Sequence, residues 1–188
     1  MRYQCPLLVV EDINRSKKFY CELFGLRVVN DFGANITLTG GLSLQTRASW
    51  EALIGKDSGP VRYRGNDAEL YFEGEDFDEF IERLRAWQVD YVHEIHEQPW
   101  GQRAVRIYDP DGHIIEIGED MAAVCLRFLN SGMTLAQVAA RMDVSESYVT
   151  GMVKLAEQKS QTKQHLSEEH MRSGETASVP KITEDASK

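Results

Sequence analysis

Cysteine is scarce in this sequence of 188 residues, and its three copies are widely spaced. Cys5, Cys21 and Cys125 form no CxxC pair, which argues against a disulfide framework and favours the reducing cytosol. Long apolar runs are scarce as well. The run Leu7–Val10 is too short for a signal-peptide core or a membrane span. These shortages predict a soluble, cytoplasmic protein.

Positive charge is also in deficit. The chain has 21 Lys and Arg residues against 30 Asp and Glu residues, which gives a net charge of −9. An acidic surface repels phosphate backbones, so non-specific nucleic-acid binding is disfavoured, whereas a cationic or amine-bearing ligand would be attracted. The length suits one good-sized domain or two small modules.

What the chain does contain is a well-marked β-hairpin at residues 103–118. Its first strand ends at Tyr108, the turn Asp-Pro-Asp-Gly follows, and residues 113–117 form the second strand. Residues two apart share one face of a strand, so Glu116 and Ile115 point to opposite faces. A carboxylate inside so apolar a strand needs a partner, a metal or water.

The hairpin ends the second of two similar halves. Residues 4–45 and residues 68–117 each predict the element order β, α, β, β, β. This duplication predicts an α+β fold, in which tandem βαβββ modules form a curved, partly open mixed sheet. The halves match at their strand-to-helix corners, Asp12 and Asp76, and at their hairpin turns, Gly41 and Gly112.

Three further helices are expected after the second module. The spacing of Ala139, Val144 and Val149 resembles a helix-turn-helix, but the second helix opens with Ser-Glu-Ser-Tyr-Val-Thr-Gly, which is acidic and has no arginine. DNA binding is therefore less favoured than a helical appendage that packs on the core or across a dimer. The predicted segments are a first module at 1–48, a linker at 49–66, a second module at 67–120, a helical extension at 121–159 and a disordered tail at 160–188.

Five motifs mark the two modules: Val9-Val-Glu-Asp12, Ser16-Lys-Lys-Phe-Tyr20, Leu23-Phe-Gly-Leu26, Trp100-Gly-Gln-Arg103 and Tyr108-Asp-Pro-Asp-Gly-His-Ile-Ile-Glu116. With these motifs, residues 4–118 resemble the vicinal oxygen chelate superfamily. That group includes glyoxalase I, bleomycin-resistance proteins, fosfomycin-resistance enzymes and extradiol dioxygenases. The resemblance implies the fold but not one reaction, because this fold serves several chemistries and plain binding.

The resemblance also implies a set of candidate metal ligands. In metal-using members, each module supplies ligands from its first and last strands, and by register those positions are Cys5, Gln45, Glu69 and Glu116. Family enzymes place His or Glu there, so this chain departs at Cys5 and Gln45 and offers no imidazole. Two carboxylates and an amide would hold a divalent metal such as Mn²⁺ or Mg²⁺ weakly, and Cys5 is equally explained as a small buried apolar residue.

The leading hypothesis is a binding or resistance protein of the bleomycin-resistance type, which holds a small molecule in a concave cavity between the modules. Trp50, Trp100, Tyr71 and Phe32 are available for stacking on a flat ligand. Glu69 or Glu116 would attract an amine on that ligand. A homodimer is expected, and no membrane partner.

Two alternatives stay open. The first is a metal-dependent lyase, isomerase or thiol transferase of the same superfamily. Glu69 or Glu116 would relay a proton in that enzyme. Arg103 or Arg106 would clamp an anionic group of its substrate. The second alternative is a regulator, whose ligand-sensing core controls a helix-turn-helix output at residues 134–159.

Overall fold

A computed structural model describes residues 1–55, 59–74 and 76–174, with the backbone alone for residue 163 and residues 166–174. The chain forms two compact units, Met1–Asp120 and Met121–Lys188. The boundary falls where the second predicted module ends, so the helical extension is a unit of its own. No helix in the described part of the chain combines the length and the apolar character needed to cross a membrane.

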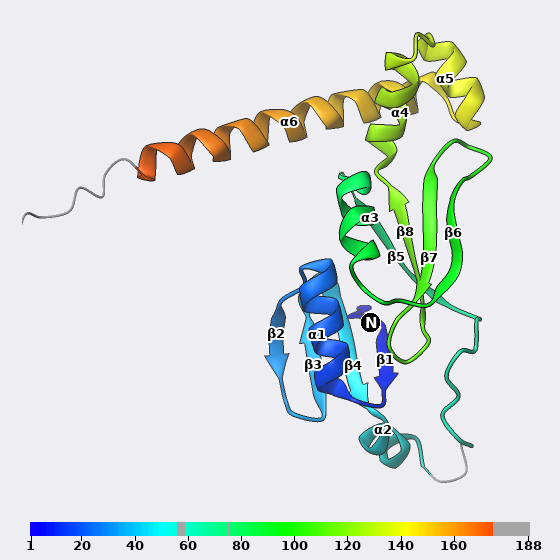
Figure 1. Ribbon diagram of the computed structural model, residues 1–188, viewed down its shortest axis with the longest axis vertical. Helices are drawn as coiled ribbons and strands as arrows, with labels where there is room; N and C mark the ends of the chain where they lie inside the picture. The colour runs from blue at the N-terminus through cyan, green and yellow to red at the C-terminus, as the bar shows by residue number, and fades with distance from the viewer. Residues whose placement is uncertain (56–58, 75, 175–188) are drawn as a thin grey trace, which may run out of the picture. The chain divides into compact units, whose positions relative to one another are not determined.

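The first module consists of β1 Leu7–Val10, α1 Ile13–Phe24, β2 Val28–Asp31, β3 Asn35–Leu38, the 3₁₀ turn η1 Thr39–Gly41 and β4 Leu42–Thr46. Its sheet has the order β1-β4-β3-β2, with β1 parallel to β4 (Figure 1). Asp12 caps α1 by accepting hydrogen bonds from the amides of Asn14 and Arg15, at 2.9 and 3.2 Å. Gly25 ends α1 in the left-handed conformation, as predicted.

The second module repeats this arrangement after a linker that opens with a short helix. Its sheet has the order β5-β8-β7-β6, with β5 parallel to β8 (Figure 1). The predicted duplication and the α+β class are therefore confirmed. The elements are α2 Arg47–Ile54, β5 Glu69–Gly74, α3 Phe77–Arg85, β6 Tyr91–Glu97, β7 Arg103–Tyr108 and β8 Ile114–Glu119.

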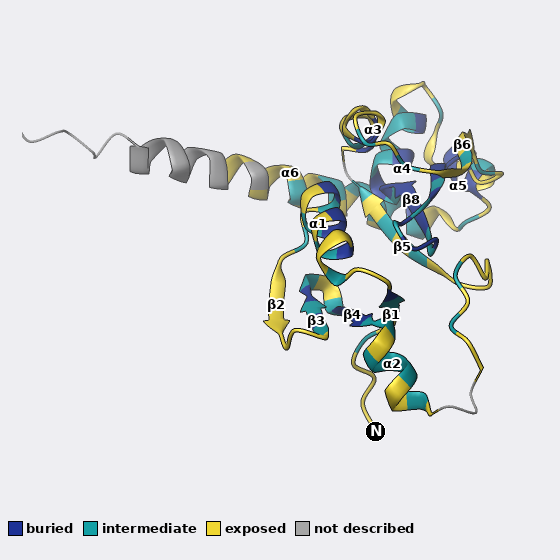
Figure 2. Cartoon of the chain, turned by 60° about the horizontal axis from the view of Figure 1, so that its bottom comes forward, coloured by how far each residue is buried: buried dark blue, intermediate teal, exposed yellow. Residues whose placement is uncertain are grey.

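Each sheet buries one face in the apolar core of the first unit, which also contains residues of α1 and α3 (Figure 2). Ile115 and Ile117 of β8 and Ile107 of β7 are at most 2% exposed. Burying each such side chain stabilises the fold by about 1.5–3 kcal/mol. Because side chains alternate along a strand, Glu116 lies on the other face of β8, as the hairpin pattern predicted.

A buried polar cluster joins α1 to the turn between β7 and β8. The hydroxyl of Tyr20, which is fully buried, donates to the carboxylate of Asp109 at 2.8 Å. Asp111, two residues later in the same turn, accepts from the hydroxyl of Ser16 at 2.9 Å and from the guanidinium of Arg15 at 2.6 Å. These contacts connect the two modules of the first unit.

The strand pairing corrects one predicted equivalence. Leu7 pairs with Ser43, and Glu69 pairs with Ile114, where Ser43 and Ile114 each lie two residues after a hairpin glycine. Glu69 therefore corresponds to Leu7 and not to Cys5, which precedes β1. The error arose because β5 has six residues where β1 has four, so counting back from the helix corner misplaces the strand by two. A shift of two preserves the face of a strand.

The second unit consists of three helices. Thr134 caps the second of them in a capping box with Gln137. The predicted disorder of residues 160–188 is wrong for residues 160–174, which continue the last helix, because Gln, Lys, Glu and Met favour helix propagation. Residues 175–188 lie outside the described residues. The helices are α4 Met121–Asn130, α5 Leu135–Met142 and α6 Glu146–Gly174.

Candidate functional site

The polar face of the second sheet gathers charged side chains from three adjacent strands. Arg106 of β7 pairs across the ladder with Glu116 of β8, so the two side chains share a face. Nε of Arg106 lies 2.8 Å from Oε2 of Glu69, which belongs to β5, and Nη2 of Arg106 forms an ion pair with Glu116. Only 7% of the Glu116 side chain is exposed. The guanidinium is therefore the partner that makes this buried carboxylate tolerable.

Two histidines of β6 also lie on this face, and the sequence did not predict them. Nε2 of His93 is 3.2 Å from Nη1 of Arg106, and the Nδ1 atoms of His93 and His96 are 3.1 Å apart. Residues three apart on a regular strand point to opposite faces. Here the register shifts between Tyr91 and His96, and the irregularity brings the two rings together. The only signal in the sequence was His-Glu-Ile-His, and on a regular strand this spacing predicts that the two histidines lie on opposite faces.

The contact with Arg106 also selects one form of His93. A guanidinium has no acceptor, so Nε2 of His93 accepts the hydrogen bond and the ring proton is assigned to Nδ1. The carbonyl oxygen of Glu94 lies 2.8 Å from that Nδ1 and accepts its hydrogen bond.

Two of the predicted ligand-binding aromatics, Tyr71 and Trp100, flank the charged group. Their side chains are 51% and 39% exposed. Gln102, which is buried, connects them: its Nε2 donates to the hydroxyl of Tyr71 at 2.8 Å, and its Oε1 accepts from the indole N–H of Trp100 at 3.1 Å. Two exposed rings held by one buried amide offer a stacking surface beside the carboxylates.

Gly118 of β8 leaves the space that this aromatic pair needs. A Cβ at Gly118 would lie 2.6 Å from Nε2 of Gln102 and 2.8 Å from the hydroxyl of Tyr71. Gly118→Val is therefore expected to displace Gln102 and to cost about 1–3 kcal/mol of stability. Urea unfolding measures the cost, and a red shift of Trp100 emission, with Trp50 and Trp87 replaced by Phe, reports the displacement.

Gly74→Val is the matched control for this substitution. Gly74 is the last residue of β5, and a Cβ there would meet no atom within 4 Å. It is expected to leave the emission of Trp100 unchanged. If Gly118→Val also left the emission and the stability unchanged, the fixed geometry of Tyr71 and Trp100 would be refuted.

The other two predicted ligand positions lie on the first module. Sγ of Cys5 is 3.3 Å from the hydroxyl of Ser43. The amide oxygen of Gln45 accepts from Asn35 at 2.7 Å, and its amide nitrogen donates to the hydroxyl of Ser49. Both side chains therefore belong to a hydrogen-bonded group on the polar face of the first sheet.

The four predicted metal ligands do not form a site that fits a divalent metal. Within the described ranges, no group of three or more His, Cys, Asp and Glu side chains is arranged to hold a metal ion. Glu69 and Glu116 are both paired with Arg106, whose positive charge lies where a cation would have to bind. The amide of Gln45 is hydrogen-bonded to its own neighbours. Oxygen ligands that already have partners are poor ligands for Mn²⁺ or Mg²⁺.

Arg103 and Trp50 lie apart from this group. Arg103 is on the helix side of β7, where it donates to Asp78 at 2.8 and 3.1 Å and to Glu119 at 3.1 and 3.2 Å. The hydrogen bonds to Glu119 and Asp78 raise the pKa of the Arg103 guanidinium, which fastens β7 to α3. Trp50 of α2 lines a separate hollow of about 310 Å³, together with Tyr63.

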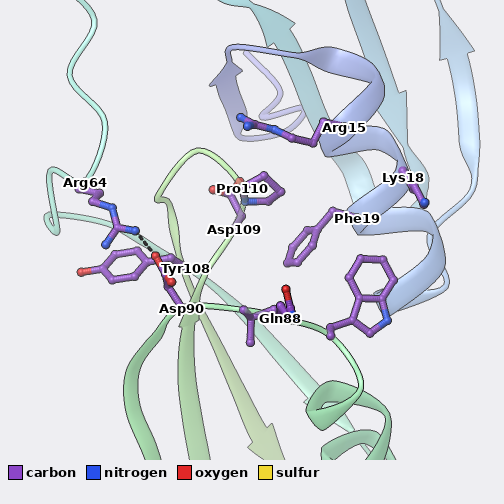
Figure 3. A pocket seen from close by; sticks show the side chains of 11 residues that line it. Arg15, Lys18, Phe19, Arg64, Gln88, Asp90, Tyr108, Asp109 and Pro110 are labelled. Atoms are coloured by element: carbon purple, nitrogen blue, oxygen red, sulfur yellow. Dashed lines mark hydrogen bonds and ion pairs between the residues drawn. The ribbon is translucent and has the colours of Figure 1, made fainter.

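Another hollow, of about 390 Å³, lies beside α1 (Figure 3). Phe19 and Trp87 supply aromatic lining, and Arg64 lies at its rim. Arg64 is ion-paired with Asp90 and stacks over Tyr108, with its Cζ 4.3 Å from the ring centroid. The positive charge of Arg64 is thus balanced by Asp90 within the protein. We therefore place the candidate site on the polar face of the second sheet.

Comparisons with known proteins identify relatives of the first unit. The sequence matches the model of a glyoxalase-like domain over residues 3–122. Among curated proteins, none matches the sequence. A crystal structure of a protein of unknown function from Agrobacterium tumefaciens is similar, with 36% identity and a TM-score of 0.58. The match covers 64% of this chain and 95% of that chain.

Two further structures carry glyoxalase names. A glyoxalase-related enzyme from Fulvimarina pelagi has 25% identity and a TM-score of 0.55, over 63% of this chain and 88% of its own. A glyoxalase/bleomycin resistance protein/dioxygenase family enzyme from Burkholderia phytofirmans has 15% identity and a TM-score of 0.54, over 63% of this chain and 98% of its own. The second likeness shows the fold alone.

Proposed function

Because this chain belongs to the glyoxalase-like family of the vicinal oxygen chelate superfamily, whose fold serves both catalysis and plain binding, we propose that it binds a planar, amine-bearing small molecule. The binding surface is the polar face of the second sheet, and Arg106 takes the place of a metal ion there. The single observation that carries the proposal is the bridge from Arg106 to Glu69 and Glu116.

The charges of this surface favour a cationic ligand. Two carboxylates and one guanidinium leave one negative charge on the group formed by Glu69, Glu116 and Arg106. The carboxylate of Glu69 is 39% exposed and is the more accessible of the two. An amine that approached this carboxylate would gain a charge-assisted hydrogen bond.

The aromatic rings favour a planar ligand. Tyr71 and Trp100 are exposed on the same module as the carboxylates, and Gln102 already holds their polar atoms. Binding would therefore lose little side-chain freedom in these two rings, which improves affinity. Stacking on Trp or Tyr, with a cation near the ring, adds about 0.5–2 kcal/mol for each contact.

Isothermal titration with metal-free bleomycin, which joins a planar bithiazole to a cationic tail, tests the proposal. The full-length protein is expected to bind it, and treatment with EDTA is expected to leave the affinity unchanged. Trp100→Ala and Tyr71→Ala are each expected to weaken binding about tenfold, which corresponds to about 1.4 kcal/mol.

Phe32→Ala provides a matched control. Phe32 was also predicted to stack on a ligand, but it belongs to the first module, outside the proposed site, and it is 74% exposed. The variant is expected to bind bleomycin as the unmodified protein does. Two results would refute the proposal: no binding heat with the folded protein, or equal affinity in all three variants. Binding that disappears with EDTA would favour the metal-dependent alternative.

A further inference from the structure

The helical unit Met121–Lys188 contains a helix-turn-helix. The two helices α5 and α6 are joined by three residues, in which Asp143 adopts the left-handed conformation with φ of 56°. The amide of Tyr148 donates to the hydroxyl of Ser145 at 3.2 Å, which caps the first turn of α6. A three-residue turn between two capped helices is the arrangement that places a second helix in the DNA major groove.

An apolar core holds these helices together. The amide of Val144 donates to the carbonyl of Ala139 at 3.0 Å and closes the turn, while Ala139 and Val149 are at most 5% exposed. The three positions singled out by their sequence spacing therefore have the expected places. The core residues are Val124, Cys125, Phe128, Val138, Ala139, Met142 and Val149.

Over residues 146–158, the outer face of α6 is polar and carries no carboxylate. Successive residues are turned by about 100° in an α-helix, so the side opposite the buried Val149 carries Ser147 and its helical neighbours. Glu146 and Glu157 project about 80–100° to one side of Ser147. The acidic opening that argued against DNA in the sequence therefore lies off this face. The face consists of Ser147, Gly151, Lys154 and Gln158, which are all exposed.

Gly151 has no internal reason to be glycine. It lies inside α6, where glycine is destabilising relative to alanine. A Cβ at this position would meet no atom within 4 Å, so packing in the unit does not require its absence. A glycine at the centre of an exposed polar helix face instead suits a partner that approaches the backbone closely.

The net negative charge of the protein comes from the first unit alone. Residues 1–120 have 13 Lys and Arg against 22 Asp and Glu, whereas residues 121–188 have 8 of each. The helical unit is therefore electrically neutral, and the overall charge of −9 does not describe the surface of α6. Ser, Gln and Lys side chains are donors that read phosphates and base edges. The exposed apolar side chain Leu155 lies at the edge of the outer face, so the centre of this face lacks the large apolar group that would suit a protein partner.

From these observations we propose that the unit 121–188 binds duplex DNA, with the outer face of α6 in the major groove. Gly151 allows close approach, Lys154 contacts a phosphate or a base edge, and the hydroxyl of Ser147 donates to a neighbouring acceptor. This function is separate from the proposed small-molecule site, and either can fail without the other.

The test uses the full-length protein and a fluorescein-labelled pool of random DNA duplexes of about 40 base pairs, at about 50 and 200 mM salt. The protein is expected to retain the pool at low salt, to release most of it at high salt, and to enrich a sequence over rounds of selection. Lys154→Glu is expected to weaken binding of the selected duplex about tenfold or more. Gly151→Leu is expected to weaken it similarly while it raises the melting temperature.

Gly151→Leu separates loss of binding from loss of folding, because leucine is the better helix former. Lys18→Glu is the matched control: it makes the same change of charge at an exposed position of the first unit. It is expected to bind the selected duplex as the unmodified protein does. The proposal is overturned if the folded protein retains no duplex at low salt, or if Lys154→Glu and Gly151→Leu bind as tightly as the control.

Discussion

Arg106→Met is expected to lower the free energy of unfolding of the first unit by about 3 kcal/mol. The substitution keeps the length of the side chain but leaves Glu69 and Glu116 close together without a positive charge. Most of the loss comes from Glu116, because its side chain is only 7% exposed and water has little access to its unpaired carboxylate. Urea unfolding of the full-length protein, followed by the fluorescence of the tryptophans of the first unit, measures the loss.

The double variant Arg106→Met with Glu116→Gln is the control for this experiment. An uncharged amide needs no counter-ion, so the double variant is expected to recover at least half of the lost stability. The single variant is also expected to gain stability from millimolar Mn²⁺, because two unpaired carboxylates can then act as ligands. A single variant as stable as the unmodified protein would show that Arg106 does not neutralise Glu116.

Asp109→Ala is expected to cost about 3 kcal/mol, through the buried cluster that joins the modules. The Asp109 side chain is 0% exposed and accepts from the hydroxyl of Tyr20, from the amides of Asp111 and His113, and from Nδ1 of His113, at 2.8–2.9 Å. Alanine would leave the hydroxyl of Tyr20 buried without its acceptor, which by itself costs about 1–3 kcal/mol. Thermal unfolding compares this variant with Asp109→Asn, which keeps an acceptor and is expected to lose less.

The same cluster predicts a pH dependence with a definite sign. Burial works to raise the pKa of Asp109, but the hydrogen bonds and charge of His113 outweigh it, and the pKa is lowered. A group whose pKa is lowered by folding stabilises the folded state above its unfolded value of about 3.9, and that contribution is lost as the pH falls through the folded value. Unfolding measured from pH 6 to pH 3 is expected to show this loss, and Asp109→Ala should show less of it.

Tyr20 is expected to make the stability of the folded protein fall at alkaline pH. Burial, followed by the nearby charge of Asp109, raises the pKa of Tyr20 well above its ordinary value. The unfolded chain releases this proton near pH 10 while the folded chain keeps it, so the stabilisation is complete below about pH 10 and falls as the pH rises further. Tyr20→Phe is expected to flatten this alkaline branch. An unchanged branch would show that Tyr20 is not the group that titrates.

Local patterns in the sequence predicted most of the fold. Asp12 as a cap, Gly25 as a left-handed terminus and the alternation around Glu116 involve residues within a few positions of one another. Such features depend on local backbone geometry and hydrogen bonding, and any homologous turn or helix end would show them. The prediction of disorder was wrong for residues 160–174. These residues are polar but have good helix propensity, and they continue a helix that begins before them.

The candidate site was predicted only in part. The face of Glu116 followed from alternation along its own strand, but its partner did not, because Arg106 lies on a different strand and only the register of β7 against β8 places it opposite. His93 and His96 were missed, because a regular strand would turn them to opposite sides and the irregularity of β6 turns them to one. Arg103 was expected to bind a ligand, and its place in the fold gives it Asp78 and Glu119 instead.

By itself, the sequence determined that this protein has two copies of one βαβββ module and a helical unit after them, because periodicity and turn chemistry act between near neighbours in the chain. Only the tertiary structure decided that Arg106 neutralises Glu69 and Glu116, and that Glu146 and Glu157 lie beside the outer face of α6 and not on it. The physical reason is that side-chain electrostatics depends on distances of a few ångströms between residues far apart in the chain, and strand register and helix packing set those distances.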